Sequence, residues 1–516
     1  MSACFSIVRL VSIWLVLVVA VQADWLSDIG YTQLAAELGA SMPTGAGIPL
    51  LQSEADNGGT IPDYLPQAGG PAAFTGTGSF AGKTFNPASG QGTDNGHAAA
   101  VATYFYANNF GLARGATEIH NYTASDFVDR MFSGNEPENL PGRVHNHSWA
   151  GSMGVEADDI ELLRRIDFLI QRDSRIVSIP LANTPTVMQP LLGNNYHGIT
   201  VGVRSGAHSQ TGTNTDGSGR MKPDLVADAT YTSHAAPIIG GAAAMLLQKG
   251  DTMADPDAIK PQTVKAILIA GASKDHLPQW QRDSSAEPYD DVFGAGEVNI
   301  RNAMHILSAG QQTYSTTTER GSTGWDFATT TNQAAGRRYF FSIPAGSQAN
   351  TFSAALTWHR SVTQFLGIYS SSLTDLTLEL YAATAFTPGA LLSASTSAVD
   401  NVEHLFLYNL PPGQYMLKVT ASAGNRDYAL AWQAVAGTGP TLSIRRTASQ
   451  WYLDSDSLDP YATYVIESSP DLTAGSWTAL HTFRTADTTP AHSAAWLHST
   501  PAPERQFFRL RWTPVR

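Results

Sequence analysis

Three residue types that together can activate a nucleophile occur along the chain in the order Glu54, His97 and Ser233. A serine hydroxyl is a weak nucleophile until a base within hydrogen-bond reach takes its proton, and that base needs a carboxylate to fix its tautomer. Glu54 closes the apolar run "IPLLQSE", and His97 opens the small-residue run "GHAAAVATY". These residue types could therefore carry out nucleophilic catalysis together, with Ser233 as the nucleophile, His97 as the base and Glu54 as the orienting acid.

Ser233 lies near the start of a long apolar segment, from Ala229 to Gly250, which predicts a helix buried inside a large domain. Pro237 is expected in its first turn, where a missing backbone N–H is tolerated. Gly240 and Gly241 leave room for close backbone packing. A serine at the N-terminus of such a helix lies beside unpaired N–H groups and the positive end of the helix dipole, which can stabilise an oxyanion. The alternative is a serine that only caps a core helix.

Each of the other signals also has an ordinary structural explanation. His97 could be a surface or core histidine, and Glu54 could be the polar end of a strand. Asn183 ends the apolar run "IVSIPLAN" and could donate an amide hydrogen bond to an oxyanion, although asparagine is also common in turns. Asp56 follows Glu54 by two residues and would point to the same face of a continuing strand, so it is the alternative orienting acid.

The order acid, histidine, serine is that of subtilisin, and residues from about 30 to 305 resemble a subtilisin-like serine protease domain. The resemblance is carried by short motifs in the family's order: "GAGIPLLQSEA", "NGHAAAVA", "HNHSWAG", "VSIPLANT", "GRMKPDLVAD", "TSHAAPIIGGAAAMLLQ" and "GAGEVNIRNA". It implies a serine endopeptidase in which Ser233 forms an acyl-enzyme, His97 moves the proton and Glu54 orients the imidazole. It also implies that Asn183 and the Ser233 N–H hold the oxyanion. Substrate backbone is expected to pair with Ser148, Trp149, Ala150 and Gly151.

Several positions depart from the family's pattern. The acid is Glu54 rather than an aspartate, which adds a methylene and displaces the carboxylate by about 1.5 Å. Ala98 and Ala99 follow the histidine where the family usually has Gly-Thr, and Tyr231 replaces a glycine before the serine motif. The usual folding prodomain is not expected. These departures leave an alternative function open: an exported binding or adhesion protein built on a catalytically impaired subtilisin-like scaffold.

The chain of 516 residues is long enough for several domains. Residues 1–23 resemble a signal peptide, which predicts a periplasmic or extracellular protein, and a retained membrane anchor is the alternative. Apolar runs that alternate with helical stretches over 24–308 predict a subtilisin-like α/β domain, with a parallel sheet flanked by helices. Strand patterns over 309–436 and 437–516 predict two all-β, sandwich-like domains.

The net charge of −13 and the lack of basic runs argue against nucleic acid as a partner. Polypeptide substrates are the expected partners, with a cell surface or a polysaccharide as candidates for the β domains. The sequence has no His-Glu-x-x-His run and no histidines clustered at ligand spacing, so no metal or other cofactor is expected. The acidic segments 283–291 and 454–459 are alternative calcium sites, although solvated loops explain them as well. Cys4, the single cysteine, lies in the predicted signal peptide, so no disulfide is expected.

Overall fold

A seven-stranded parallel sheet forms the centre of the N-terminal half of the chain, with the strand order β3-β5-β1-β6-β7-β8-β9. Its strands are β1 (Leu50–Glu54), β3 (Thr84–Pro87), β5 (Glu118–Thr123), β6 (Val144–His147), β7 (Ile176–Pro180), β8 (Ile199–Val203) and β9 (Leu225–Ala227). The computed structural model describes residues 25–66, 79–277, 279–331, 335–345, 348–437, 441–447, 451–456, 458, 463–473, 476–484, 491–496 and 507–513. The predicted signal peptide, residues 1–23, lies outside the described residues.

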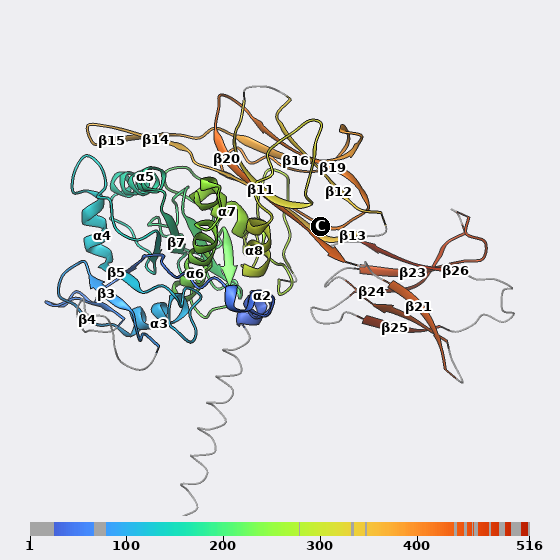
Figure 1. The fold of residues 1–516 in the computed structure, drawn as a ribbon, viewed down its shortest axis with the longest axis horizontal. Helices are drawn as coiled ribbons and strands as arrows, with labels where there is room; N and C mark the ends of the chain where they lie inside the picture. Colours follow the sequence, from blue (N-terminus) through green and yellow to red (C-terminus); the bar gives the residue numbers. More distant parts are fainter. Residues whose placement is uncertain are drawn as a thin grey trace, which may run out of the picture.

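Helices cover both faces of the sheet (Figure 1). One face is covered by α2 (Tyr31–Leu38), α3 (Gly96–Phe105), α6 (Thr232–Gly250), α7 (Pro261–Ala270) and α8 (Ile300–Ser308), and the other by α4 (Ala124–Met131) and α5 (Glu156–Asp173). Leu50 packs into the first core and Leu51 into the second, because successive strand residues point to opposite faces. The α/β architecture predicted from the sequence is therefore confirmed.

The N-terminal segment is part of this domain. Trp25, Ile29 and Leu34 are buried in the core, and the backbone N–H of Ile300 donates to the carbonyl of Ile29 over 2.8 Å. The remaining short elements of the domain are the 3-10 helices η1 (Gly39–Ser41) and η2 (Pro256–Ile259) and the parallel pair β2 (Asp63–Leu65) and β4 (Thr93–Asp94).

Two sheets that share a hydrophobic core follow the α/β domain. One has the order β10-β12-β19-β16-β17 and the other β11-β20-β13-β18. Their strands are β10 (Glu319–Arg320), β11 (Thr323–Thr329), β12 (Arg337–Ile343), β13 (Gln348–Trp358), β16 (Leu376–Thr384), β17 (Thr387–Ser395), β18 (Val402–Leu410), β19 (Gly413–Ala421) and β20 (Asp427–Gly437). All pairs are antiparallel except β10 with β12. This β-sandwich confirms the all-β character predicted after the α/β domain.

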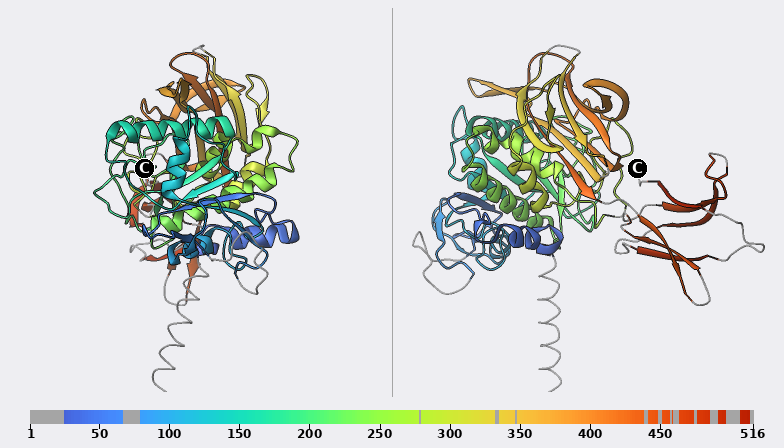
Figure 2. Two further views of the ribbon diagram at one scale, coloured as in Figure 1. Left: turned by 90° about the vertical axis from the view of Figure 1, so that its left-hand side faces the viewer. Right: turned by 45° about the vertical axis from the view of Figure 1, so that its right-hand side comes forward.

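The four-stranded sheet of the sandwich rests on α7 and α8 (Figures 1 and 2). Trp325 on β11 is fully buried, and its Nε1 donates to the carbonyl of Leu307 over 3.1 Å. Ala355 and Ala429, from β13 and β20, belong to the same hydrophobic core as α6 and α7. A hairpin formed by β14 (Ser361–Phe365) and β15 (Ile368–Ser372) lies along α5. One face of this sheet thus completes a core of the α/β domain, while its other face packs in the separate core of the sandwich.

Buried ion pairs join the same two regions. Arg360, only 3% exposed, donates to Asp167 over 2.8 Å and to Asp216 over 2.6 Å. Asp167 is fully buried on α5, and Arg164 of the same helix also pairs with Asp216, over 2.7 Å. Removing one member of a buried ion pair leaves an uncompensated charge and is strongly destabilising. The sandwich is therefore an integral part of the fold.

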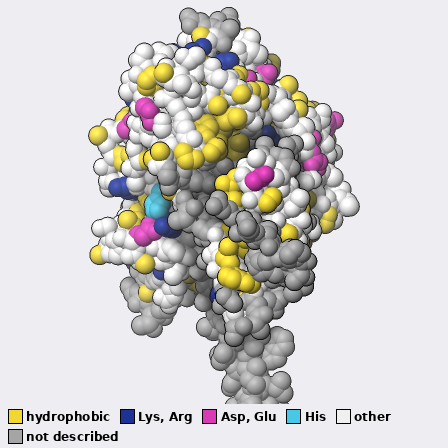
Figure 3. Space-filling model, turned by 90° about the vertical axis from the view of Figure 1, so that its right-hand side faces the viewer, with side chains coloured by type: hydrophobic (Ala, Val, Ile, Leu, Met, Phe, Trp, Pro, Cys, Tyr) yellow, Lys and Arg dark blue, Asp and Glu magenta, His cyan; other side chains and the backbone are white. Residues whose placement is uncertain are grey.

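Two small sheets end the chain, with the orders β21-β22-β25 and β24-β23-β26, and they lie to one side of the sandwich (Figure 2). Their strands are β21 (Thr441–Arg446), β22 (Trp451–Asp456), β23 (Thr463–Ser469), β24 (Thr478–Arg484), β25 (Ala491–Trp496) and β26 (Phe507–Thr513). Described Lys, Arg, Asp and Glu side chains are scattered over the face seen from this side (Figure 3). Within the described ranges, no helix has the length and apolar character needed to cross a bilayer.

Candidate active site

The candidate catalytic residues lie at one edge of the parallel sheet. Glu54 is the last residue of β1, and Asn183 lies in the loop after β7. The carboxyl ends of parallel strands meet at the same edge, where ligands bind in open α/β sheets. Ser233 lies in the first turn of α6, which follows β9, and His97 lies in the first turn of α3. The two helices pack against each other in the core.

The N-cap of α3 positions His97. The side-chain oxygen of Asn95 accepts hydrogen bonds from the backbone N–H groups of His97 (2.7 Å) and Ala98 (3.0 Å), which fixes the first turn. Ala98 and Ala102 are fully buried, and their small side chains allow close packing in the core. The imidazole of His97 is 43% exposed, so it lies at the surface of the site.

Glu54 is hydrogen-bonded to the imidazole of His97. Its Oε2 lies 2.8 Å from Nδ1 of His97. Complete burial raises the pKa of Glu54, although the contact with His97 opposes the rise. The hydrogen bond to Glu54 raises the pKa of His97. Asp56, the alternative acid, lies beyond the end of β1 and accepts from the backbone N–H of Gly58 over 2.7 Å. The structure thus brings Glu54, and not Asp56, to the imidazole.

The other imidazole nitrogen faces the nucleophile. Nε2 of His97 lies 3.0 Å from Oγ of Ser233, whose side chain is nearly buried. An ionised carboxylate only accepts hydrogen bonds, so Nδ1 carries the proton and Nε2 is free to accept from the serine hydroxyl. Among the described contacts, the backbone N–H of Ser233 has no acceptor. In this geometry His97 can take the proton of the Ser233 hydroxyl, and the backbone N–H of Ser233 can donate to an oxyanion.

Pro237 lies in the second turn of α6, so its predicted place in the first turn was wrong. Its missing N–H would have bonded the carbonyl of Ser233, four residues earlier. Ser148 replaces that bond, because its Oγ donates to the Ser233 carbonyl over 2.8 Å and accepts from Asn146 Nδ2 over 2.8 Å. The buried side chain of Ser148 thus fixes the turn that carries the nucleophile.

The segment predicted to pair with substrate is only partly free. Ala150 is exposed, whereas Trp149 is 9% exposed and its Nε1 donates to Ser53 Oγ over 3.0 Å. The N–H and C=O of Gly151 are both bonded to the backbone of Leu191, each over 3.0 Å. The loop after β7 therefore folds back and already pairs with Gly151, and substrate pairing along Ser148 to Gly151 stays a prediction.

Asn183 is bound to the start of the nucleophile helix. Its Oδ1 accepts from the backbone N–H of Thr232 over 2.9 Å. The Thr232 hydroxyl lies 3.0 Å from the same oxygen and 2.6 Å from the carbonyl of Leu181. A backbone N–H can only donate, so Oδ1 must face α6 and the amide Nδ2 remains a donor. Asn183 thus caps the first turn of α6 at Thr232, the residue before Ser233, and Nδ2 has no acceptor among the described hydrogen bonds.

Sequence reasoning missed two neighbours of the triad. Nε2 of Gln52 donates to Oε1 of Glu54 over 2.7 Å, and the signal for it was a polar residue two positions before the acid on the same strand face. The ring of His234 lies 6.0 Å from that of His97 and stacks on Tyr104 at 5.4 Å. Burial, followed by the nearby His97, lowers the pKa of His234. Tyr231 is 52% exposed and meets His234 edge-on.

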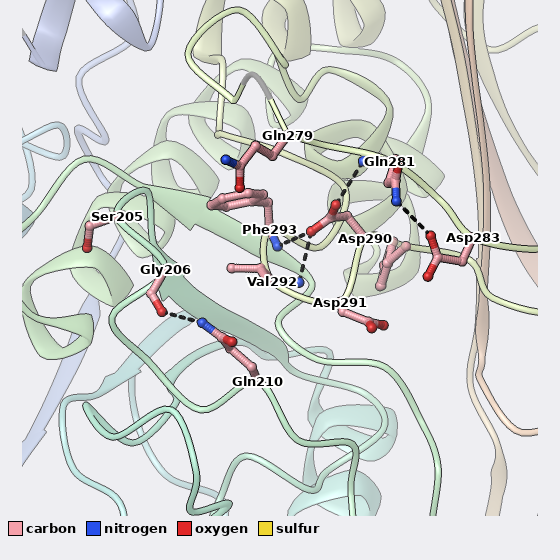
Figure 4. A pocket seen from close by; sticks show the side chains of 11 residues that line it. Ser205, Gly206, Gln210, Gln279, Gln281, Asp283, Asp290, Asp291, Val292 and Phe293 are labelled. Atoms are coloured by element: carbon pink, nitrogen blue, oxygen red, sulfur yellow. Dashed lines mark hydrogen bonds between the residues drawn. The ribbon is translucent and has the colours of Figure 1, made fainter. Parts of the chain in front are cut away.

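Among the described residues, no group of three or more His, Cys, Asp and Glu side chains could hold a metal ion. The acidic segment 283–291 lines a separate cavity of about 440 Å³ (Figure 4). Asp290 in that segment accepts from the backbone N–H groups of Gln281, Val292 and Phe293. In the other segment, Asp454 pairs with Arg445 over 2.6 Å, and Asp459 lies outside the described residues.

No family model and no curated protein matches the chain. Among solved structures, it is similar to a protease from Pseudoalteromonas arctica PAMC 21717, with 17% identity, a TM-score of 0.33 and coverage of 53% of this chain and 94% of that one. The prenylagaramide maturation protease PagA is 16% identical, with a TM-score of 0.37 and coverage of 54% and 98%. MycP1 with its N-terminal propeptide removed is 16% identical, with a TM-score of 0.34 and coverage of 54% and 96%.

Proposed function

We propose that the protein is a serine endopeptidase that hydrolyses peptide bonds through an acyl-enzyme. The observation that carries this proposal is the continuous hydrogen-bonded path from Glu54 Oε2 to His97 (2.8 Å) and from His97 to Ser233 Oγ (3.0 Å). A serine, an imidazole and a carboxylate in this order form the arrangement that activates a hydroxyl for attack on a carbonyl.

In the proposed reaction, Ser233 Oγ attacks the scissile carbonyl while Nε2 of His97 takes its proton. The oxyanion that forms accepts from the Ser233 backbone N–H and from Nδ2 of Asn183. His97 then gives the proton to the leaving amine, and a water molecule repeats the steps to release the acid and regenerate the serine. Glu54 keeps the proton of the imidazole on Nδ1 and stabilises the imidazolium.

We further propose that the protein is exported, on the basis of residues 1–23, and acts on polypeptides in the periplasm or outside the cell. The acidic net charge of −13 makes nucleic acid an unsuitable partner. The β domains are candidates for contact with a cell surface or a polysaccharide. The proposed chemistry needs no metal or other cofactor.

Labelling with a fluorophosphonate tests the proposed function. The probe is expected to react with the purified protein at Ser233, because only a deprotonated serine attacks the phosphorus at a useful rate. Mass spectrometry of the labelled peptide identifies the residue, and Ser233→Ala is the control that should not react. A wild-type protein that stays unlabelled, or an alanine variant that labels equally, would contradict the mechanism. The unlabelled result would favour the impaired scaffold with a binding role.

Asn183→Asp separates the two roles of Asn183. Aspartate keeps the oxygen that accepts from the Thr232 N–H and is a good N-cap, but it cannot donate to an oxyanion. We expect kcat to fall about 10²- to 10³-fold, as for the loss of one oxyanion donor, with little change in the thermal midpoint. The measurement is peptide hydrolysis beside a thermal melt. Unchanged kcat would show that Asn183 only caps α6.

A further inference from the structure

We infer that Gln52 and Tyr106 are positioning residues that hold the glutamate of the triad in the place where it can orient His97. The inference rests on the proposed function and extends it to side chains that do not touch the substrate. Gln52, Glu54 and Tyr106 are all fully buried, so water does not replace the contacts between them.

The hydrogen bonds of Gln52 are fully determined by its neighbours. Its Nε2 donates to Oε1 of Glu54 over 2.7 Å and to the backbone carbonyl of Ala98 over 2.9 Å. Both of these partners only accept, so the nitrogen of the amide must face them. The oxygen of the amide faces the other way and accepts from the hydroxyl of Tyr106 over 2.5 Å. Burial raises the pKa of Tyr106 well above its ordinary value, so the hydroxyl keeps its proton.

These bonds give the buried network a single direction. Tyr106 donates to Gln52, Gln52 donates to Oε1 of Glu54, and only Oε2 is left for His97. The carboxylate therefore meets the imidazole as an acceptor, which keeps the proton of His97 on Nδ1 and leaves Nε2 for Ser233. Gln52 and Tyr106 thus set the orientation of the carboxylate, and the carboxylate in turn keeps the proton of His97 on Nδ1.

A glutamate needs this support more than an aspartate would. It has one additional rotatable bond between the strand and the carboxylate, so the position of its oxygens is less well fixed by the backbone. Gln52 and Glu54 are two residues apart on β1 and point to the same face. Their side chains run side by side, and the Gln52 amide holds one carboxylate oxygen while His97 holds the other.

Gln52 is also anchored to α3. Ala98, whose carbonyl accepts from Gln52, is the residue directly after His97. Tyr106 is the C-cap of the same helix. Gln52 therefore ties the end of β1 to both ends of α3, the helix that carries the catalytic base, and fixes the distance between the acid and the imidazole.

A double-mutant cycle tests this inference. Gln52→Leu is expected to lower kcat about 10- to 100-fold with KM unchanged, in the range seen when a supporting hydrogen bond to a functional side chain is lost. In a Glu54→Gln background the same change should cost about 2-fold or less, because the carboxylate that Gln52 holds is already gone. Equal losses in both backgrounds, or no loss in the wild type, would overturn the inference.

Two further readouts exclude a merely structural effect. Gln52→Leu should shift the acidic limb of the kcat profile to lower pH and should weaken the downfield proton NMR signal of His97 Nδ1–H, because both depend on contact with Glu54. Tyr106→Phe removes one oxygen and should change both readouts in the same direction. If Gln52→Leu does not fold, the result for Tyr106→Phe alone tests the inference. Tyr428→Phe is the matched control, since its buried hydroxyl bonds Tyr339 in the sandwich, and it should change neither.

The failure of this inference is distinguishable from the failure of the proposed function. A wild-type protein that does not react with the fluorophosphonate overturns both. A wild-type protein that reacts, together with a folded Gln52→Leu variant that has the same kcat, pH profile and NMR signal, overturns only the role of Gln52 and Tyr106.

Discussion

Replacing Glu54 by glutamine is expected to lower kcat about 10⁴-fold, with KM nearly unchanged, as for other changes that impose the wrong histidine tautomer. Gln52 donates to Oε1 of Glu54, so the oxygen of the new amide would take that position and its NH₂ would face His97. Nδ1 of the imidazole would then have to accept, and its proton would move to Nε2. In that form the imidazole cannot take the proton of Ser233.

The pH dependence of kcat gives the same variant a second readout. The neutral imidazole is the active base, and contact with Glu54 raises the pKa of His97. Activity of the wild type should therefore disappear as the pH falls through a value above about 6.5, the ordinary value for histidine. In Glu54→Gln the remaining activity should persist to lower pH, because the charge that raised the pKa is absent.

Asp56→Asn is the control for Glu54→Gln. The Asp56 carboxylate accepts from the backbone N–H of Gly58 and has no contact with His97 among the described hydrogen bonds. We expect a change of about 2-fold or less in kcat, as for surface substitutions away from a site. A large loss of kcat in Asp56→Asn, with near-normal activity in Glu54→Gln, would show that Asp56 and not Glu54 is the orienting acid.

The sequence predicted those parts of the site that depend on local pattern. Glu54 closes an apolar run that forms a buried strand, and Ser233 precedes an apolar run that forms a buried helix. Strand ends and helix starts meet at one edge of a parallel sheet, and the resemblance to subtilisin-like domains implied that the acid, the base and the nucleophile lie together there. The close backbone packing expected at Gly240 and Gly241 is present at Gly241, since a Cβ there would lie 3.3 Å from the backbone nitrogen of Ala113, whereas the nearest atoms at Gly240 belong to side chains.

The parts that were wrong or missed depend on contacts between distant segments. Because Pro237 has no N–H, the carbonyl of Ser233 lacks its helical donor, and Ser148, far earlier in the chain, donates to it instead. Gly151 is occupied by Leu191 because the loop after β7 folds back on it. Tyr106 reaches Gln52 from the end of α3. Hydropathy and spacing describe neighbours along the chain, so they carry no information about such partners.

Contacts between distant segments also determine how the β-sandwich is attached. The strand patterns that begin after residue 308 predicted it as a separate domain. A change from helical to strand periodicity shows where the secondary structure changes, but not whether the hydrophobic cores on the two sides are independent. Trp325, Ala355 and Ala429 are apolar residues of strands in the sequence, and only the structure shows that they complete the core around α7 and α8.

A chain that ends after Ser308 is therefore expected not to fold. It would expose the apolar surface that Trp325 and its neighbours cover, and it would leave Asp167 buried without Arg360. Loss of one partner of a buried ion pair costs about 3–5 kcal/mol, and burying a large apolar side chain is worth about 1.5–3 kcal/mol. Together these losses approach the total stability of a typical domain, about 5–15 kcal/mol.

Expression of residues 25–308 beside residues 25–437 tests this expectation. The longer chain keeps the sandwich and loses only β21–β26, which pack mainly on one another, so it should melt cooperatively and react with the fluorophosphonate. The shorter chain should lack a cooperative melt and should not react. Arg360→Met in the full chain isolates the ionic contribution and should lower the thermal midpoint by several degrees. A chain of residues 25–308 that melts like the longer one would show that the sandwich is an independent appendage, and the shared core would then contribute little to stability.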